Sequence, residues 1–259
     1  MQAILNIIEE WPKTTAYLVL HILAFIWIRY VTLKDLFRTM DDKEINTKFA
    51  PFVRKDLTNI HIIWSLPWYL TFIPRCIMGW LAMMILGFGT AFIAFGHDCT
   101  NLDPYRKWMI KKLSQYCCRV VVFVLGYWWI DYEYDTKVDY REYLGPDWKP
   151  KFEGAYIYVG NHIGFCDVMT ATYWLYPSFI ARSTVKKIYF LRKIGEAARC
   201  LWVTRIGAGA KESKIQVIKD LKEHVRLNEE GKMKQPMCIF PEGATTTGEY
   251  ITQFKLGAF

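Results

Sequence analysis

The sequence predicts an α/β fold, a sheet with flanking helices, preceded by N-terminal membrane helices, and two features lead to this expectation. Short β-rich runs alternate with helical patterns from Tyr127 onward, which favours helices packed on a sheet. Ahead of them, residues 76–96 carry no charge. In addition, 53% of the 259 residues are hydrophobic, a high share for a freely soluble protein.

Residues 1–56 are expected to hold a membrane or interfacial helix and a charged linker. The stretch 15–28 is apolar apart from His21 and is short for a span, so it either crosses the bilayer or lies at its surface. Glu9 and Glu10 stand where a signal peptide would be basic, so we expect this segment to be retained. Residues 29–56 mix both signs of charge and are interpreted as an exposed connector rather than a short amphipathic helix.

Residues 57–103 are predicted to form a transmembrane or re-entrant helical hairpin. The uncharged stretch 76–96 is long enough to cross the hydrocarbon core of a bilayer. The stretch 59–75 is also apolar, but Pro67 and Pro74 break a straight helix there. We therefore expect residues 57–96 to form a broken hairpin in the membrane.

Residues 104–259 are predicted to form the α/β domain. Its first helix, 104–124, has four basic residues before an apolar end and suits either a position against lipid headgroups or a plain buried helix. The strand candidates are 127–134, 155–159, 178–181, 201–204 and 237–240. The helix candidates between them are 168–176, 185–199 and 211–227, the last with Ile215, Ile218, Leu221 and Val225 at helical spacing.

The net charge of +8 is compatible with nucleic acid, anionic lipid or an anionic substrate. The apolar segments favour the last two, and no nucleic-acid-binding motif accompanies the charge, so we expect no nucleic-acid partner. Seven cysteines show no paired metal-ligand spacing. They predict reduced thiols, no metal site, and a soluble part on the reducing side of the membrane.

The stretch "NHIGFCD" contains the first candidate catalytic pair, His162 and Asp167. Residues five apart in a helix lie about 140° apart around its axis, so the pair can meet only across a turn, which Gly164 permits. A carboxylate that holds one imidazole nitrogen leaves the other free to act as a general base. Apart from Cys166 no nucleophile is evident, which makes a substrate hydroxyl the expected nucleophile. The alternative is that Asp167 only caps a helix and His162 is a loop residue.

Two further loops are expected at the same edge of the sheet. "FPEG" places Glu242 and Gly243 directly after the strand candidate 237–240, where ligand sites form in open α/β sheets. Glu242 can accept a hydrogen bond from a polyol hydroxyl, and Gly243 lets the backbone approach a ligand. Arg205 follows the strand candidate 201–204 and can bind a phosphate, although such an arginine is more often a surface residue.

The ordered set "NHIGFCD", "VTR", "FPEG" and "FKLGAF" resembles the glycerophospholipid acyltransferase family. Within it, the ending is most similar to the branch of lysophosphatidylcholine and endoplasmic reticulum glycerol-3-phosphate acyltransferases. The resemblance implies a glycerol-3-phosphate acyltransferase-like sheet, His162 as the base and Asp167 as its orienting partner. It implies that Arg205, Glu242 and Gly243 help to bind the acceptor. Acyl-coenzyme A would be the co-substrate, its thioester oxygen held by backbone donors, with no cofactor.

The sequence departs from this family in two places. Ala244 stands where the branch usually has threonine, and Thr245 is a substitute for the lost hydroxyl. Relatives also continue past "GAF" into a fourth motif, so we expect the domain to be incomplete at Phe259.

The leading hypothesis is a membrane-bound O-acyltransferase that moves a fatty acyl group from acyl-coenzyme A to a lysophospholipid or glycerol phosphate. The alternative is a catalytically inactive structural subunit of a larger membrane complex. We expect an integral protein of the endoplasmic reticulum, or of the mitochondrial inner membrane under the alternative. In both cases its soluble part would face the cytosol or the matrix.

Overall fold

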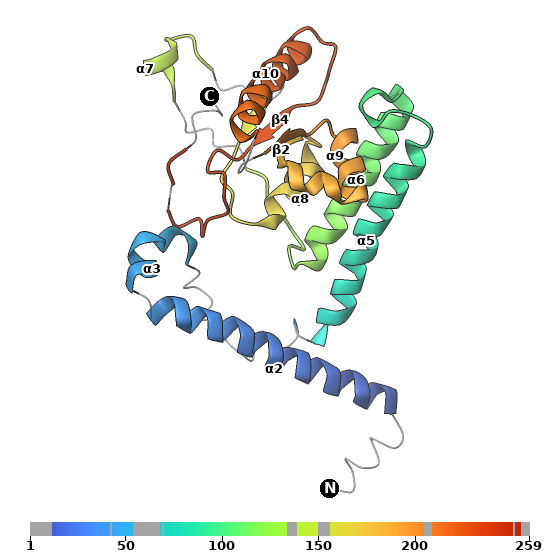
Figure 1. The fold of residues 1–259 in the computed structure, drawn as a ribbon, viewed down its shortest axis with the longest axis vertical. Helices are drawn as coiled ribbons and strands as arrows, with labels where there is room; N and C mark the ends of the chain where they lie inside the picture. The colour runs from blue at the N-terminus through green and yellow to red at the C-terminus, as the bar shows by residue number, and fades with distance from the viewer. Residues whose placement is uncertain are drawn as a thin grey trace, which may run out of the picture. The chain divides into compact units, whose positions relative to one another are not determined.

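The computed structural model describes residues 12–41, 43–53, 68, 70–133, 139–149, 156–204, 209–250 and 252–254. The chain divides into two compact units. Figure 1 shows the helices and strands of the chain, coloured by residue number. The first comprises residues 1–80 and 245–252. The second comprises residues 81–244 and 253–259 and contains the sheet.

The sheet has four parallel strands. They are β1 (Ile157–Val159), β2 (Ser178–Arg182), β3 (Leu201–Val203) and β4 (Met237–Ile239), in the order β1-β4-β2-β3. The last strand in sequence is thus inserted between β1 and β2, and Met237 is fully buried. In this register Val159 lies opposite Ile239. The loops that follow β1 and β4 therefore leave the sheet side by side.

Helices make the connections between the strands. They are α8 (Phe165–Trp174), the 3-10 helix η4 (Ser183–Lys187), α9 (Tyr189–Ala197) and α10 (Ala210–Glu229). Parallel strands require such crossovers, and here each crossover includes at least one helix. Leu221 of α10 packs with Met237 and Ile239 of β4, which joins this helix to the sheet.

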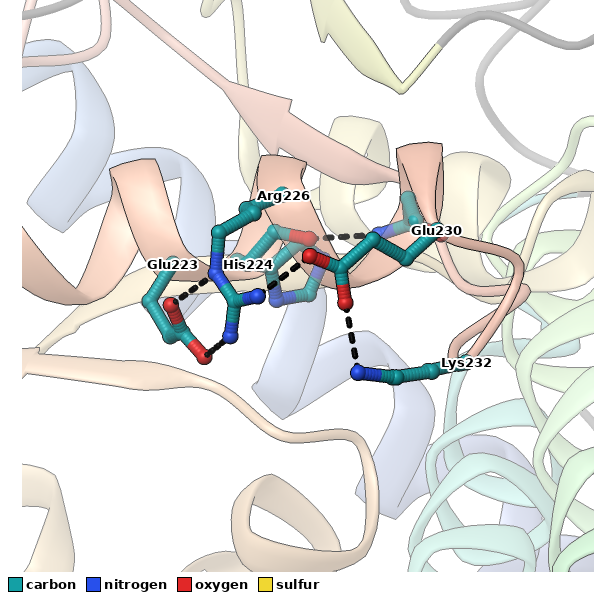
Figure 2. Close-up of polar contacts among 6 residues, drawn as sticks. Glu223, His224, Arg226, Glu230 and Lys232 are labelled. Atoms are coloured by element: carbon teal, nitrogen blue, oxygen red, sulfur yellow. Dashed lines mark hydrogen bonds and ion pairs between the residues drawn. The ribbon is translucent and has the colours of Figure 1, made fainter.

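The opposite face of α10 carries exposed ion pairs. Figure 2 shows Arg226 between Glu223 and Glu230, with Lys232 contacting Glu230 at 2.7 Å. Such exposed pairs contribute little to stability, and the helix is held by its buried residues instead. These are Val217, Leu221, His224 and Asn228, at spacings of three and four.

Two long helices precede the sheet, α5 (Phe72–Ile93) and α6 (Pro104–Val124), with the 3-10 helix η3 (Cys99–Asn101) between them. Asp103 caps α6 by accepting hydrogen bonds from the backbone nitrogens of Tyr105 and Arg106. One core cluster joins α5, α6 and α8, and its buried members are Ala82, Leu86, Cys117, Cys118, Val121, Val122 and Met169. One face of α6 is therefore buried, while Tyr105, Trp108 and Tyr116 on the other face are exposed.

The first unit contains α2 (Pro12–Asp41), α3 (Lys43–Lys48) and the 3-10 helix η1 (Ala50–Phe52). By length and composition, Pro12–Val31 and Phe72–Ile93 are able to cross a membrane. In an apolar 18-residue window of each helix, 6% and 22% of the residues, respectively, are buried inside the protein. A short helix, α7 (Arg141–Leu144), lies in the second unit.

Four of the five predicted strands are confirmed within two residues at each end, as is the helix 104–124. The strand expected at 127–134 is wrong, because residues 127–133 are irregular and residue 134 lies outside the described residues. The carbonyls of Tyr127 and Trp128 accept hydrogen bonds from the Arg119 side chain instead of from a neighbouring strand. A β-rich composition forms a strand only where a partner strand is available.

Other boundaries also differ from expectation. The helix predicted at 168–176 begins at Phe165, and the first part of the helix predicted at 185–199 is the 3-10 helix η4. In the stretch 29–56, where a connector was preferred to a short helix, α2 continues to Asp41 and the short helix α3 follows, while residues 42 and 54–56 lie outside the described residues. The stretch contains no glycine, and Lys, Arg, Leu and Met favour a helix. In the expected hairpin 57–96, residues 57–67 and 69 lie outside the described residues, and residues 72–93 are helical.

Candidate active site

The candidate site lies where β1 and β4 end. The Gly160 nitrogen continues the ladder by donating to the Ile239 carbonyl at 3.1 Å. The loop that follows β1 carries His162, and the loop that follows β4 carries Glu242. The expectation that "NH" and "FPEG" meet at one sheet edge is therefore confirmed by the strand order.

Asp167 has both of the roles that were weighed as alternatives. It is the third residue of α8, and its Oδ2 accepts hydrogen bonds from the backbone nitrogens of Ile163 at 2.7 Å and Gly164 at 2.9 Å. The same oxygen lies 2.9 Å from Nδ1 of His162. The helix cap thus fixes the carboxylate, and the fixed carboxylate orients the imidazole.

The His162 ring is held by stacking as well as by Asp167. It lies on Phe240 with ring centroids 4.4 Å apart and planes 14° apart, and Phe240 stacks in turn on Phe179. Because Asp167 accepts at Nδ1, that nitrogen carries the proton of the neutral ring. The other nitrogen, Nε2, has no hydrogen-bond partner in the described part of the chain and is available as an acceptor.

Glu242 connects the two loops. Its side chain is buried, and Oε1 accepts a hydrogen bond from the His162 backbone nitrogen at 3.1 Å. Gly243 adopts φ +70, a conformation that other residues rarely take, and its nitrogen donates to the Phe240 carbonyl at 3.0 Å. Glu242 and Gly243 therefore shape the loop beside His162.

A cavity of about 970 Å³ reaches this site. Its size is at the upper end of the range of roughly 300–1,000 Å³ that small-molecule sites have. Its wall is mainly apolar, with contributions from α5, α6, α8, the sheet and α10. His162, Phe240 and Gly243 belong to that wall.

Two basic residues also line the cavity. Arg182 ends β2 and Lys214 lies in the first turns of α10, and both are exposed. Ile218 of α10 also lines the cavity and is 44% exposed, and Ile215 is exposed as well. The cavity opens beside these turns.

The thiols near the site are unsuited to nucleophilic attack. Burial, with the Asp167 carboxylate as a smaller cause, raises the pKa of Cys166. The same two causes raise the pKa of Cys238 to about 11. A protonated thiol is a poor nucleophile. All seven cysteines are free, as the sequence predicts for reduced thiols.

The structure brings together four of the five predicted site residues. Arg205 lies outside the described residues. The residue before it, Thr204, is described, and the Thr204 backbone nitrogen donates to the Ser213 hydroxyl at 2.9 Å. No cluster of His, Cys, Asp or Glu able to hold a metal occurs among the residues that the structure describes. Sequence reasoning missed Phe240. Its place at the end of the strand candidate 237–240, directly before Pro241, was the available signal.

Residues 136–259, which include this site, match the Acyltransferase family. Lysophospholipid acyltransferase LPEAT1 of Arabidopsis thaliana is 27% identical over 182 residues, which cover 64% of this chain and 44% of LPEAT1. LPEAT2 of the same plant is 26% identical over 162 residues, which cover 62% of this chain and 26% of LPEAT2. The chain thus spans less than half the length of these curated relatives. No solved structure matches it.

Proposed function

We propose that this chain is a glycerophospholipid acyltransferase and transfers a fatty acyl group from acyl-coenzyme A to the hydroxyl of a lysophospholipid or glycerol phosphate. The match of residues 136–259 to the Acyltransferase family and the four motifs support this proposal. The observation that carries the proposal is the His162–Asp167 pair, with His162 on the wall of an apolar cavity. LPEAT1 and LPEAT2 are named as lysophospholipid acyltransferases, which favours a lysophospholipid as the acceptor.

In the proposed reaction His162 is the general base. As the acceptor hydroxyl attacks the thioester carbonyl carbon and a C–O bond forms, its proton passes to Nε2. The C–S bond then breaks, and the departing thiolate takes the proton from the imidazolium. The products are the acylated lipid and free coenzyme A, without a covalent enzyme intermediate.

The surrounding residues support this cycle. Asp167 keeps the proton on Nδ1 before the reaction and stabilises the imidazolium during it. Phe240 and the contact between Glu242 and the His162 backbone limit the movement of the ring. Less reorganisation of the base leaves a smaller barrier to the proton transfer.

The cavity suits the lipid part of the substrates. Its apolar wall is able to bury a fatty acyl chain, and burial of each CH₂ contributes about 0.8 kcal/mol. We also propose that Arg205, Glu242 and Gly243 help to bind the acceptor. The proposal includes a glycerol-3-phosphate acyltransferase-like sheet, domain boundaries after residues 56 and 103, and a location in the endoplasmic reticulum. The two apolar helices support membrane association.

Release of free coenzyme A from acyl-coenzyme A, in the presence and absence of lysophospholipid, tests the function. We expect His162→Ala to lower the acceptor-dependent rate by about 10²- to 10⁴-fold, the usual contribution of a general base. His97→Ala is the matched control, since His97 is exposed and lies outside the cavity wall. Equal activity of His162→Ala would contradict the base assignment.

The inactive-subunit hypothesis predicts a different result. No acyl transfer by wild type with any acceptor, together with purification in constant proportion to other proteins, would favour a structural role. An active purified chain would exclude it.

A further inference from the structure

The segment that follows α6 exposes an unusual number of aromatic rings. Tyr127, Trp128, Trp129 and Tyr132 are 52%, 61%, 81% and 59% exposed. Burial of such rings usually contributes strongly to stability, so their exposure needs a reason. Scattered exposed aromatic residues are ordinary, but a contiguous group marks a surface that meets another apolar phase.

This segment is attached firmly to the second unit. Arg119 donates to the carbonyls of Tyr127 at 3.3 Å and Trp128 at 2.6 Å. Between the exposed rings, Ile130 packs against the cluster that joins α5, α6 and α8. The backbone is therefore fixed with its aromatic side chains directed outward.

The segment also runs along α8, which begins just after the His162 loop. At one end, the Tyr127 side chain is within hydrogen-bonding reach of the Cys166 thiol. At the other end, the Tyr132 ring meets Trp174 with centroids 5.4 Å apart. Ile163 and Phe165, on either side of Gly164, are 48% and 59% exposed. We call the set of Tyr127, Trp128, Trp129, Tyr132, Ile163 and Phe165 the aromatic rim.

The composition of the rim identifies what it meets. Tyrosine and tryptophan combine an apolar ring with a polar group and are enriched at the boundary between lipid headgroups and hydrocarbon. On α6, the helix that precedes the rim segment, Tyr116 is 71% exposed and the cation Lys112, four residues before it, is exposed as well. Lysine next to aromatic residues complements the phosphates of anionic lipid, whereas it is depleted in protein interfaces.

The neighbouring helix leads to the same conclusion. Ala82 and Leu86 of α5 belong to the cluster on which Ile130 packs. The outward residues of α5 are apolar, and Leu81, Ile85 and Phe88 are 46%, 56% and 57% exposed. A helix that suits the hydrocarbon layer thus lies directly beside residues that suit its boundary.

We propose that the aromatic rim is a membrane-docking surface that holds the His162 loop at the headgroup level of a bilayer. A lysophospholipid would then reach the cavity from the membrane, without crossing water. This entry route rests on the proposed function, whereas the membrane contact of the rim does not.

Tryptophan quenching by brominated lipids tests the contact directly. The full chain is placed in phosphatidylcholine vesicles that contain phosphatidylserine, with bromine near the headgroup or near the chain end. The difference in emission between wild type and Trp128→Phe/Trp129→Phe isolates these two indoles. We expect the difference to be quenched more by bromine near the headgroup. A difference spectrum that neither lipid quenches would overturn the proposal and leave a protein partner as the occupant of the rim.

Rate measurements test the consequence. We expect Trp128→Ala/Trp129→Ala to lower the rate on vesicle-borne lysophospholipid about tenfold, equivalent to about 1.4 kcal/mol, and to leave the rate on a short-chain, water-soluble lysophospholipid unchanged. Tyr143→Ala is the matched control, because Tyr143 is 76% exposed on α7, outside the rim. Equal losses on both acceptors would contradict a docking role. An inactive wild type whose indoles are quenched would refute the proposed function alone.

Discussion

Replacement of Asp167 by asparagine separates its two roles. In the wild-type protein, the carboxylate oxygen Oδ2 accepts hydrogen bonds from the backbone nitrogens of Ile163 and Gly164 and from Nδ1 of His162. An asparagine oxygen at the Oδ2 position is able to accept the same three hydrogen bonds, so the turn and the orientation of the imidazole are kept. The negative charge that stabilises the imidazolium is lost, so proton transfer to the base becomes less favourable.

The expected magnitudes differ widely between activity and stability. Loss of the negative charge near the N-terminus of α8 costs about 0.3–1 kcal/mol of folding free energy. Replacement of the carboxylate by an amide lowers kcat by about 10⁴-fold in a hydrolase with an equivalent pair. For Asp167→Ala, three lost hydrogen bonds at about 1 kcal/mol each predict a loss near 3 kcal/mol. The asparagine variant should therefore be folded and inactive.

The assay combines coenzyme A release with thermal unfolding of the same samples. Asp103→Asn is the matched control, because Asp103 caps α6 with two backbone hydrogen bonds and orients no imidazole. We expect that variant to lose a similar amount of stability and to retain its activity. A folded Asp167→Asn protein with unchanged kcat would refute the argument that the carboxylate charge assists the base.

The remaining predictions concern residues around the site and the core. Glu242→Ala leaves the His162 backbone N–H without its acceptor and should lower the free energy of unfolding by about 1–3 kcal/mol, measured by thermal or denaturant unfolding. Glu242→Gln should lower it less. Equal losses in the two variants would contradict the hydrogen bond. Gly195→Ala places a Cβ 2.7 Å from the Trp202 ring, so we expect overpacking to lower the free energy of unfolding by about 1–3 kcal/mol. The cavity should also become smaller, which would be seen as weaker binding of long acyl chains. Unchanged stability would show that the ring moves freely. Burial lowers the pKa of His224, so the folded protein favours the neutral ring. Its contribution to stability is complete above the unfolded pKa of about 6.5 and is lost as pH falls through the lower folded pKa, and a His224→Gln variant should show a smaller loss of Tm between neutral and mildly acid pH.

Much of the site was predictable because its motifs follow strands. The strands 155–159 and 237–240 are apolar runs that end at glycine and proline, so the loops "NHIGFCD" and "FPEG" were placed at sheet ends from local pattern alone. The contact between His162 and Asp167 also depends on only six consecutive residues. A turn and a helix cap are local structures, which local sequence specifies.

Predictions that depended on distant partners were less successful. The run at 127–134 has strand composition, but Arg119 takes its carbonyls and no neighbouring strand is paired with it. The spacing of Ile215, Ile218 and Leu221 indicated a helix, but Ile215 and Ile218 are exposed, and the buried residues of α10 include Val217, Leu221 and His224. A period indicates a helix but does not say which of two neighbouring faces is covered.

The sequence by itself determined the alternation of strand and helix, the apolar helices and the His162–Asp167 turn, because these depend on residues close together along the chain. Only the tertiary structure decided that β4 enters the sheet beside β1, and this long-range pairing brings Glu242 and Phe240 to His162. The same packing of α5, α6 and α8 against the sheet encloses the cavity and leaves the aromatic rim outside. Contacts between residues 80 positions apart depend on the packing of whole elements, and no local pattern contains that information.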